Sequence, residues 1–297
     1  MFKIIFRLAK HLPRRAQYVE STLQNPPAEG AFSRYHILID AFEQACRTFP
    51  TPISEDDENI IRNQPWTEAQ YFYGGRSALK ICIDALIRAN AAPPQQILDF
   101  PCGHGRTLRF LSAAFPQATL YASDLITSGT KFCRDQFNSK TFVSNFDFSR
   151  IDFPQGNDLI WCGSLITHLS ETRAKQVINR LTQSLSPNGI LLFTTHGRMY
   201  PRCLHTLSPM LKPSEWDNVI CDFYRKGYGY QVYSVPKYIE TGYGFSLTSP
   251  HWIFENVIRT NDDITLILFA EKGWHEHQDV TAIQMKALTT WYNTDFL

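Results

Sequence analysis

The sequence predicts an α/β fold built on a seven-stranded, mostly parallel sheet that ends in an antiparallel pair of strands. Between residues 96 and 196, five short apolar runs alternate with helical stretches, which implies right-handed βαβ crossovers. After residue 262, two further apolar runs are joined through residues 271–277, a link too short for a parallel return. An N-terminal helical cover and an aromatic insertion complete the expected architecture.

Composition is that of a folded protein. The 297 residues are 43% hydrophobic and 19% charged, which excludes wholesale disorder. A formal charge of +1 argues against a protein that coats nucleic acid, because phosphate neutralisation needs a concentrated basic surface. The longest apolar runs, such as Ile190-Leu191-Leu192-Phe193, are far shorter than the roughly 20 residues of a membrane span. Seven cysteines without C-x-x-C spacing indicate reduced thiols and a cytoplasmic location.

The N-terminal segment, residues 1–74, is expected to be mostly helical. Its first fifteen residues carry five basic side chains and no acid. They suggest either a surface helix docked on its own protein or an amphipathic helix that touches an anionic membrane or a partner. Residues 31–49 have helical spacing until Pro50 and Pro52 stop the helix. The acidic run Glu55–Glu58 is interpreted as a solvated face.

The core is expected at residues 75–197 and to be completed by residues 251–297. A helix over 76–90 precedes the first strand. The expected strands are 97–100, 119–122, 141–144, 159–162, 190–195, 263–270 and 279–285, and the intervening helices lie near 105–115, 127–138 and 171–185. In parallel sheets of this kind, ligands bind outside the carboxyl ends of the strands.

A glycine-rich turn, Cys102-Gly103-His104-Gly105-Arg106, connects the first core strand to its helix. Glycine lets the backbone approach a ligand, and the free amides of the following helix point to the same place. The next strand ends about 20 residues later at Asp124, where an acid can accept hydrogen bonds from ribose hydroxyls. The nucleoside could belong to NAD or to S-adenosylmethionine. A dinucleotide fingerprint needs a third glycine where this chain has Leu108, which favours S-adenosylmethionine.

These motifs and their order resemble the class I S-adenosylmethionine-dependent methyltransferases, which have a Rossmann-like fold. The matching segments are Leu98-Asp99-Phe100-Pro101-Cys102-Gly103-His104-Gly105-Arg106, Ala122-Ser123-Asp124-Leu125, Asn145-Phe146-Asp147-Phe148, Asp158-Leu159-Ile160-Trp161-Cys162 and Leu185-Ser186-Pro187-Asn188-Gly189. The resemblance covers roughly residues 75–196, and the terminal strand pair extends it. Pro101 stands where the family usually has its first glycine, which changes the expected path of the loop.

The resemblance implies a set of cofactor-binding residues. They are Tyr73, Arg76, Asp99, Phe100, Pro101, Gly103, Gly105, Asp124, Leu125, Asp147, Phe148, Cys162 and Gly163. In this set Asp99 and Gly103 face the methionine part, while Asp124 takes the ribose. Arg76 pairs with the cofactor carboxylate, unless it is a plain surface cation. The alternative for Asp124 is a helix N-cap for residues 125–138.

The remaining positions of the set surround the adenine and the transferred methyl group. Leu125 packs on the adenine, and Asp147 accepts a hydrogen bond from its amino group, with Phe148 against the ring. Asp147 could instead cap a turn. Cys162 and Gly163, just past the fourth strand, line the methyl-transfer site.

Methyl transfer from a sulfonium needs alignment, a site without water and sometimes a base for the acceptor's proton. The candidate catalytic residues follow the fourth and fifth strands, namely His168, His196 and Tyr200. For His168, a structural hydrogen bond is the alternative. No metal is expected, because the pair in His275-Glu276-His277 has no third ligand at a suitable spacing.

Residues 198–250 form an insertion too long for an ordinary loop. Its aromatic residues are Tyr200, Trp216, Phe223, Tyr224, Tyr228, Tyr230, Tyr233, Tyr238 and Tyr243. They suit a lid over an organic acceptor, or a small satellite core, or both.

The sequence therefore predicts an S-adenosylmethionine-dependent methyltransferase that acts on a small molecule or a glycan. Two alternatives keep the same cofactor: attack at its aminobutyrate carbon, by transfer or cyclisation, and a scaffold that binds the cofactor without catalysis. Nucleic-acid methylation is disfavoured, because the chain reads Trp161-Cys162-Gly163-Ser164 where base-methylating members resemble N-P-P-Y or D-P-P-Y.

Overall fold

The computed structural model describes residues 29–60, 64–142, 144–201, 211–234 and 242–287. The basic segment 1–15, Cys203 and Tyr238 lie outside these ranges. The six cysteines within them are free, and four of the six are buried, as expected of reduced thiols. Within the same ranges, no helix has the length and apolar character needed to span a membrane.

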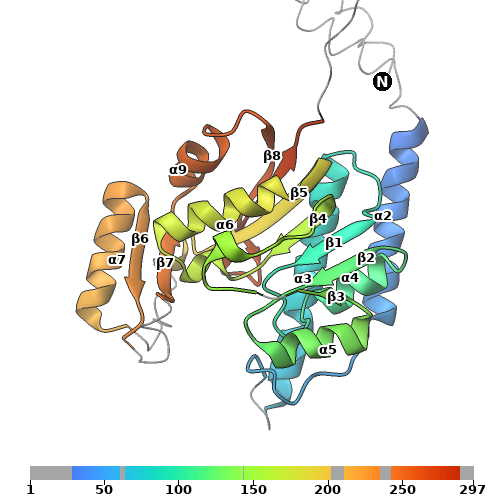
Figure 1. Cartoon of the computed structure of the whole chain (residues 1–297), viewed down its shortest axis with the longest axis horizontal. Helices are drawn as coiled ribbons and strands as arrows, with labels where there is room; N and C mark the ends of the chain where they lie inside the picture. Colours follow the sequence, from blue (N-terminus) through green and yellow to red (C-terminus); the bar gives the residue numbers. More distant parts are fainter. Residues whose placement is uncertain (1–28, 61–63, 143, 202–210, 235–241, 288–297) are drawn as a thin grey trace, which may run out of the picture.

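Seven strands form one sheet in the order β3-β2-β1-β4-β5-β9-β8 (Figure 1). They are β1 (Gln96–Asp99), β2 (Thr119–Ala122), β3 (Lys140–Thr141), β4 (Asn157–Cys162), β5 (Leu185–Thr195), β8 (Ile264–Trp274) and β9 (Gln278–Met285). The five strands from β3 to β5 pair in parallel, and β9 pairs antiparallel with both β5 and β8. The predicted mostly parallel sheet with an antiparallel end is confirmed.

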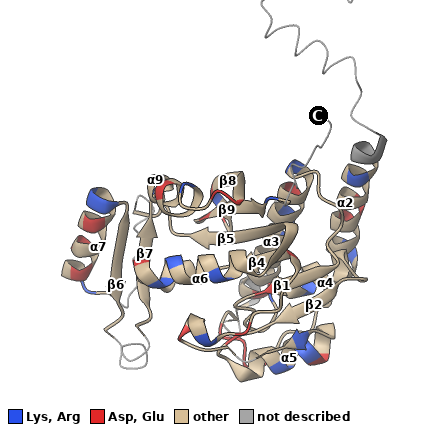
Figure 2. Cartoon of the chain, turned by 45° about the horizontal axis from the view of Figure 1, so that its top comes forward, with Lys and Arg blue, Asp and Glu red and all other residues tan. Residues whose placement is uncertain are grey.

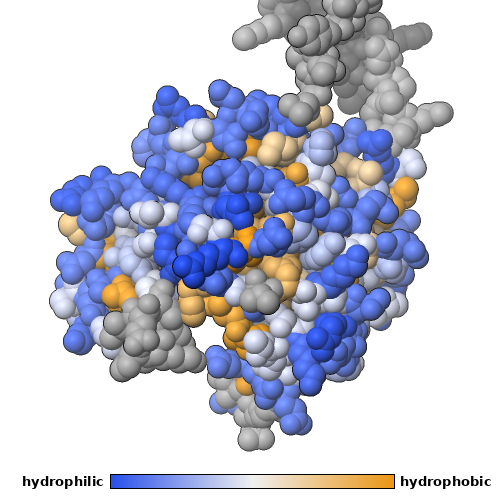
Figure 3. Space-filling view, in the orientation of Figure 1, coloured by the Kyte–Doolittle hydropathy of each residue, from blue (hydrophilic) through white to orange (hydrophobic). Residues whose placement is uncertain are grey.

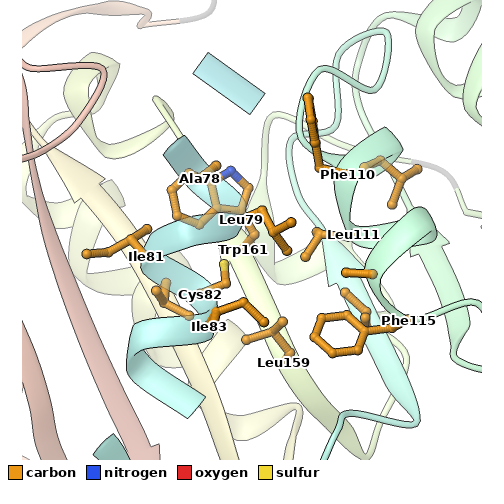
Figure 4. Close-up of a cluster of buried hydrophobic side chains, with 14 of the residues drawn as sticks. Ala78, Leu79, Ile81, Cys82, Ile83, Phe110, Leu111, Phe115, Leu159 and Trp161 are labelled. Carbon is orange, nitrogen blue, oxygen red and sulfur yellow. The ribbon is translucent and has the colours of Figure 1, made fainter. Parts of the chain in front are cut away.

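Helices cover both faces of this sheet. On one face, α3 (Pro65–Arg88), α4 (Leu108–Ala114) and α5 (Thr127–Phe137) share a buried core with the strands, and α2 (Glu29–Thr48) packs on α3 and α4. Figure 4 shows side chains of β4 in this core, between those of α3 and α4. On the other face lie α6 (Glu171–Gln183), α9 (Pro250–Ile253) and a π-helical turn (Phe254–Ile258).

Helix α3 departs most from the sequence prediction, because it begins at Pro65 and not at residue 76. Gly74 and Gly75 lie inside the helix and do not break it. A Cβ on Gly75 would stand 2.2 Å from the Arg106 carbonyl oxygen, so the glycine permits close contact between the helix and the glycine-rich turn. The expected boundary between the N-terminal segment and the core therefore falls within a continuous helix.

Strand β5 is also longer than predicted. Leu185 already pairs with Asn157, whereas residues 186–189 were expected to form only the turn after α6. The register shifts before Leu159 pairs with Ile190, and Asn188 has a φ of +65°. The turn residues thus form an irregularity within the strand.

The insertion folds as a helix on a two-stranded antiparallel sheet. The elements are α7 (Pro213–Lys226), β6 (Tyr228–Val232) and β7 (Gly244–Thr248), at the left of Figure 1. They enclose a separate core of Leu211, Trp216, Val219, Phe223, Tyr233, Phe245 and Leu247. The insertion is attached at the carboxyl end of β5, where the Thr248 amide donates to the His196 carbonyl over 2.8 Å.

Figure 2 shows that basic and acidic residues are both distributed over the outer helices and are not gathered on one side. This arrangement agrees with the balanced formal charge. In the space-filling view, a band of apolar residues reaches the surface between the insertion at the left and α5 below (Figure 3).

Candidate functional site

The two glycines of the glycine-rich turn serve different purposes. Both have positive φ, +50° at Gly103 and +78° at Gly105, in the region that side chains with a Cβ rarely adopt. A Cβ on Gly105 would lie 2.4 Å from the Phe137 ring, so this glycine lets α5 pack closely. At Gly103 no atom lies within 4 Å of such a Cβ, because the residue lines a cavity. Only Gly103 is open to a ligand.

Two adjoining cavities lie at the carboxyl ends of the parallel strands, where the sheet was expected to bind ligands. The first, about 470 Å³, has Asp99, Gly103 and Arg106 in its wall. The second, about 530 Å³, has Leu125, Phe146 and Phe148 in its wall. Five residues line both cavities: Glu58, Pro101, Asp124, Ile126 and Tyr243.

Asp124 lies where the two cavities meet. Its Oδ2 accepts from the Gly103 amide over 2.8 Å, and its Oδ1 accepts from the Ile126 amide over 3.0 Å. Burial raises the pKa of the carboxyl, while these backbone amides oppose the rise. Helix α5 begins at Thr127 with Ile126 at its N-cap, so the alternative of Asp124 as a plain helix cap is wrong. The carboxylate instead holds the glycine-rich turn in place.

Asp99, at the end of β1, is buried with 1% of its surface exposed. Its Oδ2 has no hydrogen-bond partner among the described residues. Burial raises the pKa of this carboxyl well above its usual range; Asp124 adds to the rise, and Arg106 opposes it. An orphaned acceptor at a cavity wall suits an ammonium or amide donor of a ligand.

Arg106 is a functional candidate that the sequence reasoning missed. Its guanidinium lines the first cavity and stacks over the Trp274 ring, 5.0 Å from the ring centre. Burial lowers its pKa, and no ion pair or hydrogen bond is found for it in the described parts of the chain. A cation placed directly after the G-x-G turn was the available signal.

Arg76 and Tyr73 are not at this site. They line a separate hollow between α2 and α3, together with Phe42 and Cys46. Residues 73, 76, 77 and 80 share one side of α3 at helical spacing, and that side faces away from the glycine-rich turn. The expected pairing of Arg76 with a carboxylate at the turn is therefore wrong.

The second cavity is lined by two of the three residues expected around adenine, with one exception. These two are Leu125 and Phe148, and Phe100 lines the same cavity. The exception is Asp147, which is exposed and whose Oδ1 accepts from the Ser149 amide (3.0 Å) and hydroxyl (2.6 Å). Its side chain thus caps the short 3-10 turn Phe148–Arg150, which was the alternative interpretation.

Of the two residues expected at the methyl-transfer site after β4, one lines a cavity and the other does not. Gly163 lines the first cavity, next to Ser164. The side chain of Cys162 is fully buried in the core on the α6 face and lines neither cavity, which corrects its expected place at the methyl-transfer site. Burial also raises the pKa of its thiol, so it is no nucleophile.

Three residues of the acidic run before α3, Glu55, Asp56 and Glu58, are exposed as the predicted solvated face requires, and Asp57 is the exception. Asp57 is buried, with 4% exposed, and Glu58 lines both cavities. Arg109, fully buried in α4, donates to the carbonyls of Pro50 (2.8 Å) and Pro52 (3.0 Å). This arginine ties the acidic segment to the helix behind the glycine-rich turn. We call residues 54–60 the acidic strap.

His168 is the predicted catalytic residue that reaches the first cavity. Its Nδ1 lies 2.9 Å from the Gly244 carbonyl oxygen, which can only accept, so the proton is assigned to Nδ1 and Nε2 keeps its lone pair. Burial lowers its pKa to about 4, so the ring is neutral at pH 7. Tyr243 stacks on the ring with a centroid distance of 4.5 Å.

His196 and Tyr200 lie behind this wall and line neither cavity. The His196 ring is buried between the rings of Tyr200 and Phe245, with distances between ring centroids of 4.1 Å and 4.6 Å. These contacts attach it to the core of the insertion. Burial lowers its pKa well below the usual range. The structure therefore does not bring these two candidates to a reacting atom.

Aromatic residues of the insertion form the expected satellite core, and two of them line the first cavity. Trp216 and Phe223 lie in the satellite core, Tyr228 packs into the core on the α6 face, and Tyr224 is 74% exposed. Tyr233 and Tyr243 reach the first cavity. The lid and the satellite core are thus one structure.

Comparison with known proteins finds similarity in the middle of the chain. A family model described as "Methyltransferase domain" matches residues 98–191. The malonyl-[acyl-carrier protein] O-methyltransferase of Acetivibrio thermocellus is 30% identical over 114 residues, 37% of this chain and 38% of that protein. The trans-aconitate 2-methyltransferase of Methylobacterium nodulans is 25% identical over 126 residues, 42% of this chain and 48% of that protein. The alignments thus span less than half the length of these relatives.

Among solved structures, an S-adenosylmethionine-dependent methyltransferase from Clostridium acetobutylicum is similar to this chain with a TM-score of 0.49 and 11% identity. The alignment covers 73% of this chain and 92% of that one. The family match runs from Leu98 in β1 to Leu191 in β5, which includes the glycine-rich turn and Asp124.

Proposed function

We propose that the protein is a class I S-adenosylmethionine-dependent methyltransferase that methylates a small organic molecule. The match of the methyltransferase-domain model to residues 98–191 supports this proposal. One observation carries the proposal. Two cavities meet at Asp124, one bounded by the glycine-rich turn and the other by apolar side chains. This pairing suits a ligand with a zwitterionic end, a ribose and an adenine.

The described residues fit this cofactor. The cradle at Gly103 is open, and the orphaned Asp99 oxygen can accept from an ammonium group. Asp124 has lone pairs left for ribose hydroxyls, while its two backbone hydrogen bonds keep it in place. Arg106, beside Asp99, would hold a carboxylate. When bound, the cofactor supplies an electrophilic methyl group on a sulfonium.

The chain's own residues would align the acceptor and take its proton. A bound cofactor and acceptor would displace water from the first cavity, which would strengthen each polar contact in the site. His168 lines that cavity, and its Nε2 is left unprotonated because Nδ1 donates to the Gly244 carbonyl. We assign His168 as the proton acceptor; Tyr243, stacked on it, fixes the plane of the ring.

Methyl transfer is favoured over attack at the aminobutyrate carbon and over a scaffold role, because the relatives are named as methyltransferases. Their names, malonyl-[acyl-carrier protein] O-methyltransferase and trans-aconitate 2-methyltransferase, make transfer to a carboxylic acid the second candidate for this chain.

Calorimetric titration with S-adenosylmethionine, S-adenosylhomocysteine and NAD tests the proposal. We expect saturable binding of both adenosyl compounds and none of NAD. Mass analysis of the products then separates the reactions, since S-adenosylhomocysteine reports methyl transfer and methylthioadenosine reports attack at the other carbon. Tight NAD binding without binding of S-adenosylmethionine would overturn the assignment.

A further inference from the structure

We propose that the acceptor is a flat organic amine, attacked through an uncharged nitrogen conjugated to a ring, and not a carboxylate or a phenol. This inference rests on the proposed methyl transfer and names the substrate class of the same site. Three features of the first cavity carry it: the sign of its charge, its aromatic wall and the tautomer of His168.

The charged residues of the first cavity are mostly acidic. Four carboxyl groups line it, those of Asp57, Glu58, Asp99 and Asp124, and Arg106 is the single lysine or arginine among the described residues of its wall. Burial raises the pKa of Asp99 well above its usual range and also raises that of Asp124, so Asp57 and Glu58 are the main sources of negative charge. An anionic acceptor is disfavoured beside these two carboxylates, because like charges repel.

A nitrogen acceptor fits the same charge. As the bond to the methyl carbon forms, positive charge passes from sulfur to the nitrogen, so carboxylates near the reacting atoms favour the transition state over the ground state of the free amine. A carboxylate acceptor shows the reverse behaviour, since its own negative charge disappears during the reaction.

The wall is also aromatic. Trp161, Trp274, Tyr233 and Tyr243 line the first cavity. Trp161, Trp274 and Tyr233 are buried, with 1–2% of their surface exposed, and Arg106 covers the face of Trp274. Tyr243 is half-buried and stacks on His168 with the two planes 18° apart, so its ring is the aromatic group best placed to pack on a flat ligand.

The proton balance agrees with an amine. The nitrogen lone pair forms the bond to the methyl carbon, and the bond from that carbon to sulfur breaks with its electrons left on sulfur. The methylated nitrogen, now cationic, passes its proton to Nε2 of His168 and from there to water. His168, with a pKa of about 4, is too weak a base to ionise a phenol before attack, but it can accept a proton from an acidic arylammonium ion.

Three probes that share one ring system test the inference: 2-aminonaphthalene, 2-naphthol and 2-naphthoate, together with smaller ring amines and acids. Their binding to the full chain is measured by calorimetry with S-adenosylhomocysteine present, and turnover is measured by mass with S-adenosylmethionine. We expect amines to bind and react at least about tenfold better than the matched acid or phenol. Faster reaction of the acids or phenols would overturn the inference, and so would a chain that binds the cofactor but neither binds nor methylates any amine. A chain that binds no cofactor would instead overturn the proposed function.

The acidic strap provides a variant with a matched control. Both Glu55 and Glu58 are exposed, but Glu58→Gln removes a charge from the wall of both cavities, whereas Glu55→Gln removes one from a residue of the same strap that lines neither. We expect Glu58→Gln to reduce the preference for amine over acid by about threefold to tenfold. The preference of Glu55→Gln should remain that of the unaltered protein. Equal effects of the two variants, or none from Glu58→Gln, would contradict a role of the cavity charge.

Discussion

The glycine-rich turn and the insertion border the same cavity but are built in different ways. The turn is held by backbone groups: the Gly103 and Ile126 amides fix Asp124, and positive φ angles shape the loop. The insertion contributes side chains, because Tyr233 and Tyr243 project from a unit with its own core around Trp216. The comparison teaches that the cofactor end depends on local backbone geometry, whereas the acceptor end depends on a packed accessory unit.

Loss of the insertion's core should have the largest effect and should separate the two ends. Trp216 is 3% exposed in that core, so Trp216→Ala is expected to destabilise the insertion by about 3–5 kcal/mol. Acceptor affinity should fall, while the affinity for S-adenosylhomocysteine changes little. Limited proteolysis and calorimetry measure the two effects. Tyr224→Ala, at a residue of α7 that is 74% exposed, is the control and should change neither.

A substitution that adds a side chain to the glycine-rich turn tests the cofactor end. In Gly105→Ala the new Cβ meets the Phe137 ring at 2.4 Å and must adopt a φ of +78°, so we expect about 3 kcal/mol of lost stability in urea unfolding. Gly156→Ala is the matched control. It has a similar φ of +81° but nothing within 4 Å of the new Cβ, and it should cost about 1 kcal/mol. Equal costs would show that α5 does not constrain the turn.

His168 lines the first cavity, and its protonation should lower the stability of the folded protein. Its pKa in the folded protein, about 4, lies below the usual value, so the unfolded chain binds more protons between about pH 4 and 6.5. The stabilisation is complete above the unfolded pKa and is lost as the pH falls through this window, on the order of 2–3 kcal/mol in total. His168→Gln can still donate to the Gly244 carbonyl but does not titrate. Unfolding of the unaltered protein and of His168→Gln is measured at pH 7 and at pH 4.5. The change in stability between the two pH values that is present in the unaltered protein and missing in the variant is due to His168 and not to His196. Equal changes in the two proteins would mean that the His168 ring is not desolvated.

The smallest expected effect concerns the cofactor end alone. Asp124→Ala removes the acceptor for two backbone amides and the expected ribose contact, which should weaken S-adenosylhomocysteine binding by at least about tenfold in calorimetry. Asp147→Ala removes only the cap of an exposed turn, so the affinity should stay within about twofold. A strong effect of Asp147→Ala would restore its expected contact with adenine.

Some site residues were predictable because they follow directly from a strand end. Asp99, Gly103, Asp124 and Gly163 each come just after a strand or within the turn that follows it, and the carboxyl ends of parallel strands meet at one edge. Arg76 was misplaced for the opposite reason. A side chain on a helix points to one side only, and which side of α3 faces the turn depends on how the helix packs.

By itself the sequence determined the alternation of strands and helices, the antiparallel end of the sheet, the glycine-rich turn and the acid that follows it. These features depend on periodicity and on backbone conformation, both of which are local. Only the tertiary structure decided that Asp57 of the acidic strap is buried beside the first cavity, that Arg106 and not Arg76 lines this cavity, and that Tyr243 and not Tyr200 does so. Those contacts join segments far apart in the chain, so they are set by which surfaces become buried together.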